Sequence, residues 1–189
     1  MAKRKKKLKK SRSIRKDKKI DIDQILLHNR QVFLFEDINS HSAKRIVKEL
    51  IVLDKLKVAP IALYINSPGG CLSDGFAIID VIRGVHSPII TFITGEACSM
   101  AGLISITGQK RVMSTTAIWM AHDIHSYQHD YATKMIDRTE FLKEEQKQVF
   151  DFLSKNTKLS KSDLEKARNG ELWLNAKECL KKGIIDKVV

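Results

Sequence analysis

The sequence has no long hydrophobic run. No apolar stretch approaches the roughly 18 residues that a membrane-spanning helix requires, and the basic N-terminus is not followed by the apolar segment of a signal peptide. We therefore expect no membrane association. We also expect the chain to stay in the cytoplasm, where it is made.

Cysteine is scarce, and the spacing of the cysteines does not match a metal-binding motif. The three cysteines, Cys71, Cys98 and Cys179, are an odd number and form no CxxC pair or other metal-ligand spacing. This pattern is typical of a reducing compartment and predicts neither a disulfide nor a metal site.

Positive charge is concentrated at one end of the chain. The net charge is +12, and twelve Lys or Arg against Asp17 within residues 1–19 account for +11 of it. Such a run cannot bury apolar surface, so we predict a basic, disordered arm over residues 1–24 and a folded domain over residues 25–189. A solvated tail and a polyanion-binding arm both stay open, because clustered lysines bind phosphate groups without sequence preference.

The first half of the predicted domain alternates short apolar strands with amphipathic helices. The spacing predicts strands over 32–35, 61–65 and 89–93, and helices over 41–55 and 73–85. This alternation is typical of βαβ units and predicts an α/β fold around a parallel sheet.

The second half begins with a predicted strand over 117–120 and continues with a long, charged helix over 131–155. Met135, Leu142 and Val149 recur there at heptad spacing. The helix therefore has one apolar face, which packs either on its own domain or on another subunit.

Short elements are predicted at the C-terminal end. Residues 162–165 and 175–178 both resemble capping boxes that open helices. Gly183 is a plausible helix stop before a last strand over 184–189.

Two glycine-bearing loops follow successive strands, at residues 67–70 and 95–102. Loops at the carboxyl ends of strands in an open α/β sheet line the ligand crevice. Paired Gly69 and Gly70 let a peptide backbone approach closely and leave amide N–H groups free. Taken alone, the first loop is also explained as a plain tight turn.

The second loop presents Ser99 among small residues where a helix begins. The helix start adds N–H donors and a positive dipole end. Three alternatives stay open at this point: Ser99 as a helix N-cap, Cys98 as a thiol nucleophile, and Lys110 as the base of a Ser-Lys dyad. For Lys110, residues 109–111 are better explained as a surface turn.

Among the six histidines, His122 ends the apolar strand that begins at Ala117. A histidine at a strand end is well placed to accept a proton from a hydroxyl. A structural or surface role also stays open, because spacing alone does not establish proximity to Ser99.

Read together, four segments resemble the ClpP peptidase family, in the family's order and within about residues 25 to 189. They are Tyr64–Gly70, Gly95–Ala101, Met120–His122 and the stretch from Trp173 to Asp186. The resemblance implies a crotonase-like ClpP fold of repeated βαβ units, with the helix over 131–155 projecting as a handle.

The resemblance also implies roles for five residues. Ser99 corresponds to the nucleophile and His122 to the general base. The amides of Gly70 and Met100 correspond to the oxyanion hole. The family's third catalytic member is an aspartate two residues before an aromatic, and here Glu171 occupies that position. A glutamate is one methylene longer but can still orient an imidazole.

The position after His122 also departs from the family, which usually has Gln-Pro where this chain has Asp123. Asp123 is a poor substitute for the triad acid, because neighbours on an extended segment face opposite sides.

The implied activity is that of a serine endopeptidase that hydrolyses protein or peptide substrates inside a ring-shaped chamber. The family forms two heptameric rings, a tetradecamer interlocked by the handles, and depends on an AAA+ unfoldase for processive degradation. Peptide hydrolysis of this kind requires no cofactor and no metal.

Two other functions stay open. One is an inactive ring subunit that uses its basic arm for nucleic acid or assembly. The other is an acyl-CoA enzyme of the wider crotonase superfamily. Reactivity of Ser99 distinguishes the three.

Overall fold

The computed structural model describes residues 20–126 and 129–189. Residues 1–19, on which most of the predicted basic arm and its polyanion contact fall, lie outside the described residues. The end of that predicted arm enters a helix, α1 (Ile22–His28), which Asp21 caps through its side chain. This helix was not expected from the sequence.

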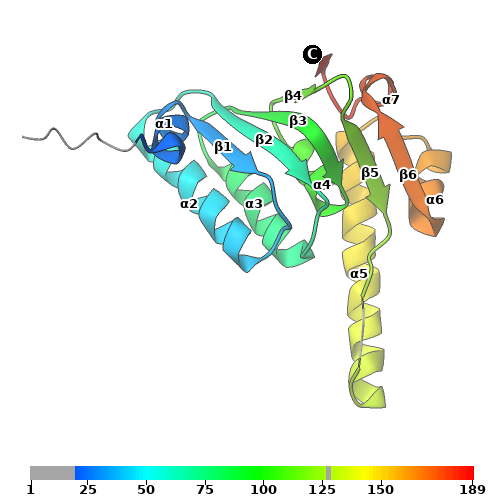
Figure 1. Ribbon diagram of the computed structural model, residues 1–189. Helices are drawn as coiled ribbons and strands as arrows, with labels where there is room; N and C mark the ends of the chain where they lie inside the picture. Colours follow the sequence, from blue (N-terminus) through cyan, green and yellow to red (C-terminus); the bar gives the residue numbers. More distant parts are fainter. Residues whose placement is uncertain (1–19, 127–128) are drawn as a thin grey trace, which may run out of the picture.

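A seven-stranded sheet forms the centre of the described chain (Figure 1). Five strands form a continuous parallel series. In spatial order they are β1 (Gln31–Leu34), β2 (Ile61–Ser67), β3 (Ile89–Cys98), β4 (Lys110–Met113) and β7 (Lys187–Val188). The prediction of a parallel α/β sheet is confirmed.

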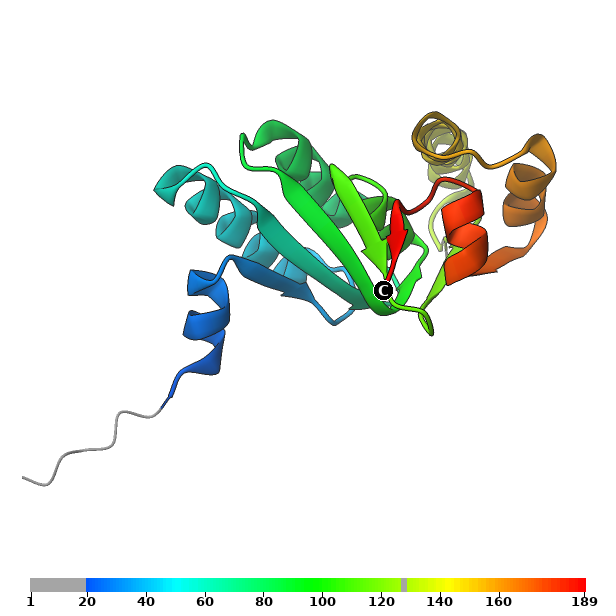
Figure 2. The same cartoon turned by 90° about the horizontal axis from the view of Figure 1, so that it is seen from above.

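Strand β3 pairs with two neighbours in succession. Its first half, Ile90 to Ile93, pairs with β4, and its last residues, Glu96 to Cys98, pair with β5 (Ile118–His122). Strand β5 in turn pairs antiparallel with β6 (Glu171–Asn175). The β5–β6 ribbon therefore diverges from the main sheet, and Figure 2 shows this C-terminal part set to one side.

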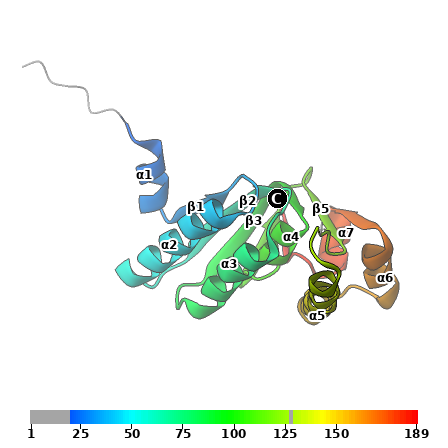
Figure 3. The same cartoon turned by 90° about the horizontal axis from the view of Figure 1, so that it is seen from below.

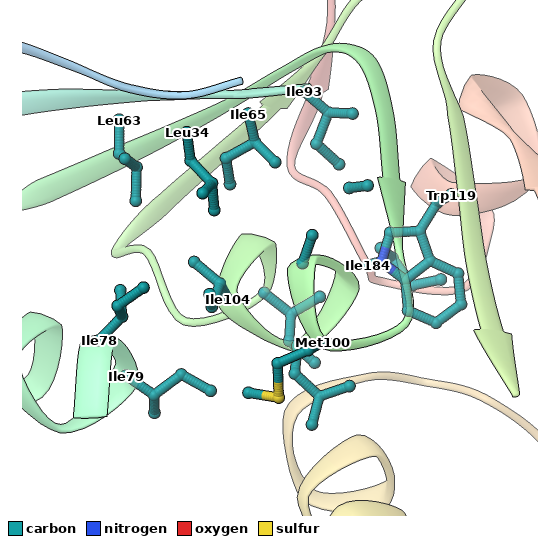
Figure 4. Packing of buried hydrophobic residues seen from close by; sticks show 14 of the residues in the cluster. Leu34, Leu63, Ile65, Ile78, Ile79, Ile93, Met100, Ile104, Trp119 and Ile184 are labelled. Atoms are coloured by element: carbon teal, nitrogen blue, oxygen red, sulfur yellow. The ribbon is translucent and has the colours of Figure 1, made fainter. Parts of the chain in front are cut away.

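Helices α2 (Ser40–Leu56), α3 (Leu72–Gly84) and α4 (Met100–Ser105) cover one face of the sheet (Figure 3). Their apolar faces pack against the inward side chains of the strands, as Leu34, Ile78 and Ile104 illustrate in Figure 4. Each fully buried aliphatic side chain of this kind contributes roughly 1.5–3 kcal/mol relative to exposure. This burial holds the strand ends that carry the glycine loops in place.

Helix α5 (Ala132–Asn156) is the predicted handle, and its N-terminal half projects away from the sheet (Figure 1). Its buried residues all belong to the C-terminal half. Val149 is only 5% exposed and packs in the core of its own domain, so for this residue the first of the two packings left open by the heptad spacing is the observed one. Within the described residues, no helix combines the length and the apolar character needed to cross a membrane.

Several predicted boundaries were wrong. Strand β3 continues to Cys98 because its end finds a second partner in β5. Lys110 and Arg111 begin strand β4 and do not form a surface turn. The polar side chains of these two residues gave no apolar pattern from which a strand could be predicted. In the structure, the Arg111 guanidinium forms an ion pair with Asp186. Strand β6 was not predicted.

The two remaining helices are α6 (Lys161–Asn169) and α7 (Ala176–Lys181). The capping box of α7 is formed by Asn175 and Glu178, as predicted. That of α6 is formed by Ser160 with Asp163, two residues before the predicted Ser162. Gly183 follows α7 at φ +63°, a conformation that glycine adopts without strain.

Asp163 links α6 to the end of α7. Lys182 Nζ lies 2.8 and 2.7 Å from its two carboxylate oxygens. Burial alone would raise the pKa of the Asp163 carboxyl, but hydrogen bonds from Lys182 and Ser160 outweigh it and lower the pKa to about 2. The pair therefore stabilises the fold at pH values above the ordinary pKa of an aspartate. This contribution is lost as the pH falls through about 2.

We expect Lys182→Met to lower the free energy of unfolding by about 1 kcal/mol at pH 7, because one carboxylate loses its charged donor. Lys181→Met, at an exposed neighbouring position, is the matched control and should be neutral. Thermal unfolding of the native protein and both variants, measured from pH 7 down to pH 2, tests this. Equal stability of the two variants at pH 7 would contradict the assignment.

Candidate active site

A pocket of about 380 Å³ lies where the two glycine loops, the end of β5 and the C-terminal half of α5 meet. Four of the five predicted site residues line it: Gly70, Ser99, Met100 and His122. The fifth, Glu171, lies outside the pocket lining but next to His122 in the sheet. The fold therefore gathers residues from three separate segments at one crevice.

Ser99 stands at the junction of β3 and α4 in a strained backbone conformation, with φ 55° and ψ −124°. Such a conformation costs a non-glycine residue roughly 1–3 kcal/mol and persists only where the surroundings enforce it. The Ser99 N–H donates to Met120 O at 2.8 Å, which fixes the turn to β5. Ser99 occupies the N-cap position of α4, but its side chain makes no capping hydrogen bond. The hydroxyl is thus available to a ligand.

The first glycine loop packs directly against this turn. At Gly69, φ is +102°, and an added Cβ would lie 2.6 Å from Cys98 O and 2.8 Å from Ser99 Cβ. At Gly70, φ is +145°, and an added Cβ would collide with the backbone of Ile38. Only glycine fits either position, so the Gly-Gly pair is required for the two loops to meet.

Two backbone amides next to Ser99 are free to donate. Ile38 pairs with the loop through its N–H to Gly69 O and through its carbonyl to the Cys71 N–H, both at 2.8 Å, which directs the Gly70 N–H away from Ile38. Met100 is the first residue of α4, where an N–H has no partner within the helix. Neither amide has an acceptor within the described residues, so both can serve a developing oxyanion.

His122 and Glu171 are directly opposite one another in the antiparallel β5–β6 ribbon. Opposite residues project to the same face, with Cβ atoms about 4.5–5.5 Å apart. The Glu171 Oε2 accepts a hydrogen bond of 2.7 Å from Trp173 Nε1. Among the described residues, neither the Ser99 hydroxyl nor Glu171 is hydrogen-bonded to His122. Catalytic hydrogen bonds are often long without substrate and tighten in the complex.

Asp123 is occupied elsewhere. Its Oδ1 accepts from Ile124 N and its Oδ2 from Gln146 Nε2, both at 2.7 Å. The bond from Gln146 ties the segment after β5 to helix α5. Both carboxylate oxygens are therefore used in holding that segment.

The alternative nucleophile and base have no support from the geometry. Burial raises the pKa of the Cys98 thiol to about 12, with further contributions from Glu96 and Glu171, so a thiolate is disfavoured at neutral pH. Lys110 begins β4 and does not line the pocket. Ser99 and His122, by contrast, both line the pocket.

Sequence reasoning missed two residues of this region, Trp173 and Gln146. Trp173 lies within a recognised segment, and its separation of two residues from Glu171 would have placed both on one face of a strand had β6 been predicted. Gln146 lies in the middle of a charged helix, and the sequence contains no signal for its contact with Asp123.

A strained serine between a strand and a helix, with a histidine and two free amides around one pocket, defines a hydrolase that uses a serine nucleophile. A sequence model of one such family, described as Clp protease, matches residues 14–189. The chain therefore belongs to the Clp protease family. The resemblance, the fold class and the serine peptidase class predicted from the sequence are confirmed.

Curated relatives cover almost the whole chain. The ATP-dependent Clp protease proteolytic subunit 1 of Chlamydia muridarum is 32% identical over 174 residues, which are 89% of this chain and 90% of the relative. The proteolytic subunit of Lactococcus lactis subsp. cremoris is 31% identical over 182 residues, covering 94% and 92%. Proteolytic subunit 2 of Treponema denticola is 29% identical over 180 residues, covering 92% and 90%. These relatives support the peptidase function and not the alternatives.

We expect iodoacetamide at pH 7.5 to modify Cys71 and to spare Cys98 and Cys179 in the folded protein. Cys71 is exposed, whereas burial raises the pKa of each of the other two thiols to about 12, which leaves almost no thiolate at this pH. Peptide mapping by mass spectrometry measures the extent of labelling at each site. Labelling of Cys98 as fast as Cys71 would contradict this environment, and labelling in denaturant is the control.

Proposed function

We propose that this chain hydrolyses peptide bonds with Ser99 as nucleophile, His122 as general base and Glu171 as the acid that orients His122. The observation that carries the proposal is the strained turn at Ser99, which presents a hydroxyl with no capping bond into the pocket that His122 lines. Strained backbone conformations of this kind cluster at active sites and ligand-binding sites.

The chemistry follows from these positions. His122 takes the proton of the Ser99 hydroxyl as Oγ attacks the carbonyl carbon of the scissile bond. The N–H groups of Gly70 and Met100 stabilise the oxyanion of the tetrahedral intermediate. His122 then gives the proton to the leaving amine, and an acyl-enzyme forms. Water, deprotonated by His122, attacks this ester, and the acid product leaves with Ser99 regenerated.

Glu171 supports the charged state of His122. When the imidazole gains the Ser99 proton, a carboxylate on the same face of the ribbon stabilises the cation. The register that places Glu171 opposite His122 supports this role.

The pocket favours an apolar substrate side chain. Helices α4 and α5 contribute three apolar lining residues, Leu103, Val149 and Leu153. Each of these side chains is at most 5% exposed. A side chain such as leucine or methionine would bury its apolar area against them, whereas a charged one would lose hydration without a partner.

The relatives are named as proteolytic subunits of ATP-dependent proteases. By analogy we propose a cytoplasmic assembly of heptameric rings with an AAA+ unfoldase as partner. Helix α5 supports self-assembly, because its projecting half exposes Ile136 and Phe141 at 62% and 54%. The polyanion contact of residues 1–19 stays a prediction.

Ser99→Ala and His122→Ala should each lower kcat for a short peptide with an apolar residue before the scissile bond by roughly 10⁴ to 10⁶, and the double variant should lose little more. The reason is that the two side chains act as one unit. Fluorescent peptide hydrolysis measures kcat, and labelling with a fluorophosphonate reports Ser99 directly. Hydrolysis by Ser99→Ala within about tenfold of the native rate would refute the proposal.

Phe141→Glu combined with Leu142→Glu should dissociate the assembly, since burying unpaired charge at an apolar contact is costly. Lys143→Glu, at an exposed neighbouring position of α5, is the matched control and should leave it intact. Sedimentation velocity measures the assembly state. An unchanged sedimentation coefficient in the double variant would show that this part of α5 is not an interface.

A further inference from the structure

One hydrogen bond beside the catalytic residues has no place in the mechanism above. The indole Nε1 of Trp173 donates to Glu171 Oε2 at 2.7 Å, a length typical of strong bonds to a charged acceptor. Both residues belong to β6, whose side chains alternate between exposed and buried from Glu171 to Asn175. Glu171 and Trp173 therefore share the exposed face of the ribbon.

His122 belongs to the same cluster. It is opposite Glu171, while Trp173 is opposite Met120, two residues earlier on β5. Opposite residues of an antiparallel pair project to one face, so the indole lies on one side of the carboxylate along the strand and the imidazole lies across from it. The carboxylate is thus placed between the indole donor and the proposed general base.

Glu171 needs such a donor. It is an exposed glutamate, and a free side chain of this type loses up to about 1.5–2 kcal/mol of rotamer freedom when it is held in one orientation. An aspartate at this position would have fewer rotatable bonds. The added methylene of glutamate therefore makes orientation toward His122 more costly unless another group restrains it.

The indole is suited to this restraint. Its N–H is a donor only, so it occupies one carboxylate oxygen, and a carboxylate has a second oxygen that can accept from an imidazole N–H. Trp173 is 47% exposed and lies outside the core cluster, so burial does not account for the orientation of its ring.

We infer that Trp173 is a positioning residue, whose indole N–H holds Glu171 Oε2 so that the other carboxylate oxygen faces His122. This role rests on the proposed function of Glu171 as the triad acid. In this chain, Glu171 and Trp173 together orient the carboxylate toward His122, whereas a shorter aspartate would do so alone.

A double-mutant cycle with Glu171→Asp tests the inference. Trp173→Phe keeps an aromatic ring and removes the donor, and we expect it to lower kcat about tenfold, the lower end for a lost hydrogen bond to a charged group. KM for a short peptide should change less than twofold. In the E171D background, Trp173→Phe should change kcat less than twofold, because the shorter carboxylate does not reach the indole.

Three outcomes would overturn the inference. Trp173→Phe within twofold of the native kcat shows that the donor is not needed. An equal loss with and without E171D shows that Trp173 acts through packing. A rise in kcat shows that the indole holds Glu171 away from His122. The rate of fluorophosphonate labelling at Ser99 is a second measurement, and sedimentation velocity checks that the assembly is retained.

These experiments separate the inference from the proposed function. If the native protein neither cleaves peptides nor reacts at Ser99, the proposed function fails. If the native protein is active and Trp173→Phe is equally active, only the role of Trp173 fails.

Discussion

The strained backbone of Ser99 is the constraint on which the site depends. A residue at φ 55° is unstable by itself and is held there by the structure on either side. The Ser99 N–H donates a hydrogen bond to Met120 O on β5. The Ser99 Cβ lies so close to Gly69 that a larger residue would not fit at that position of the first loop. The Gly-Gly pair, the end of β3 and the start of α4 therefore form one unit, in which the hydroxyl and the two free amides have fixed relative positions.

The divided pairing of β3 brings the remaining residues to this unit. Because the end of β3 leaves β4 and pairs with β5, the ribbon of β5 and β6 begins opposite Glu96 and passes Ser99 at Met120. His122 is the last residue of β5, and the register of β6 puts Glu171 opposite it. The backbone pairing of β5 with β6 thus sets where His122 and Glu171 lie relative to each other.

Helix α5 serves two regions of the molecule. Its C-terminal half closes the pocket with Val149 and Leu153, and Gln146 binds the segment that follows His122. Its N-terminal half extends away from the domain with apolar side chains exposed (Figure 1). One uninterrupted helix therefore connects the projecting half to the residues that line the pocket.

The sequence by itself determined the parallel α/β sheet and the long helix, because apolar periodicity is a local signal, while Ser99 and His122 were singled out by the family resemblance of their segments. It did not reveal strands β4 and β6, which are short and pair with strands distant along the chain. The burial of Val149 and the contact of Trp173 with Glu171 were likewise decided only by the tertiary structure. Heptad spacing does not say which surface covers a helix face, and an indole meets a carboxylate only once the strand that carries both has formed.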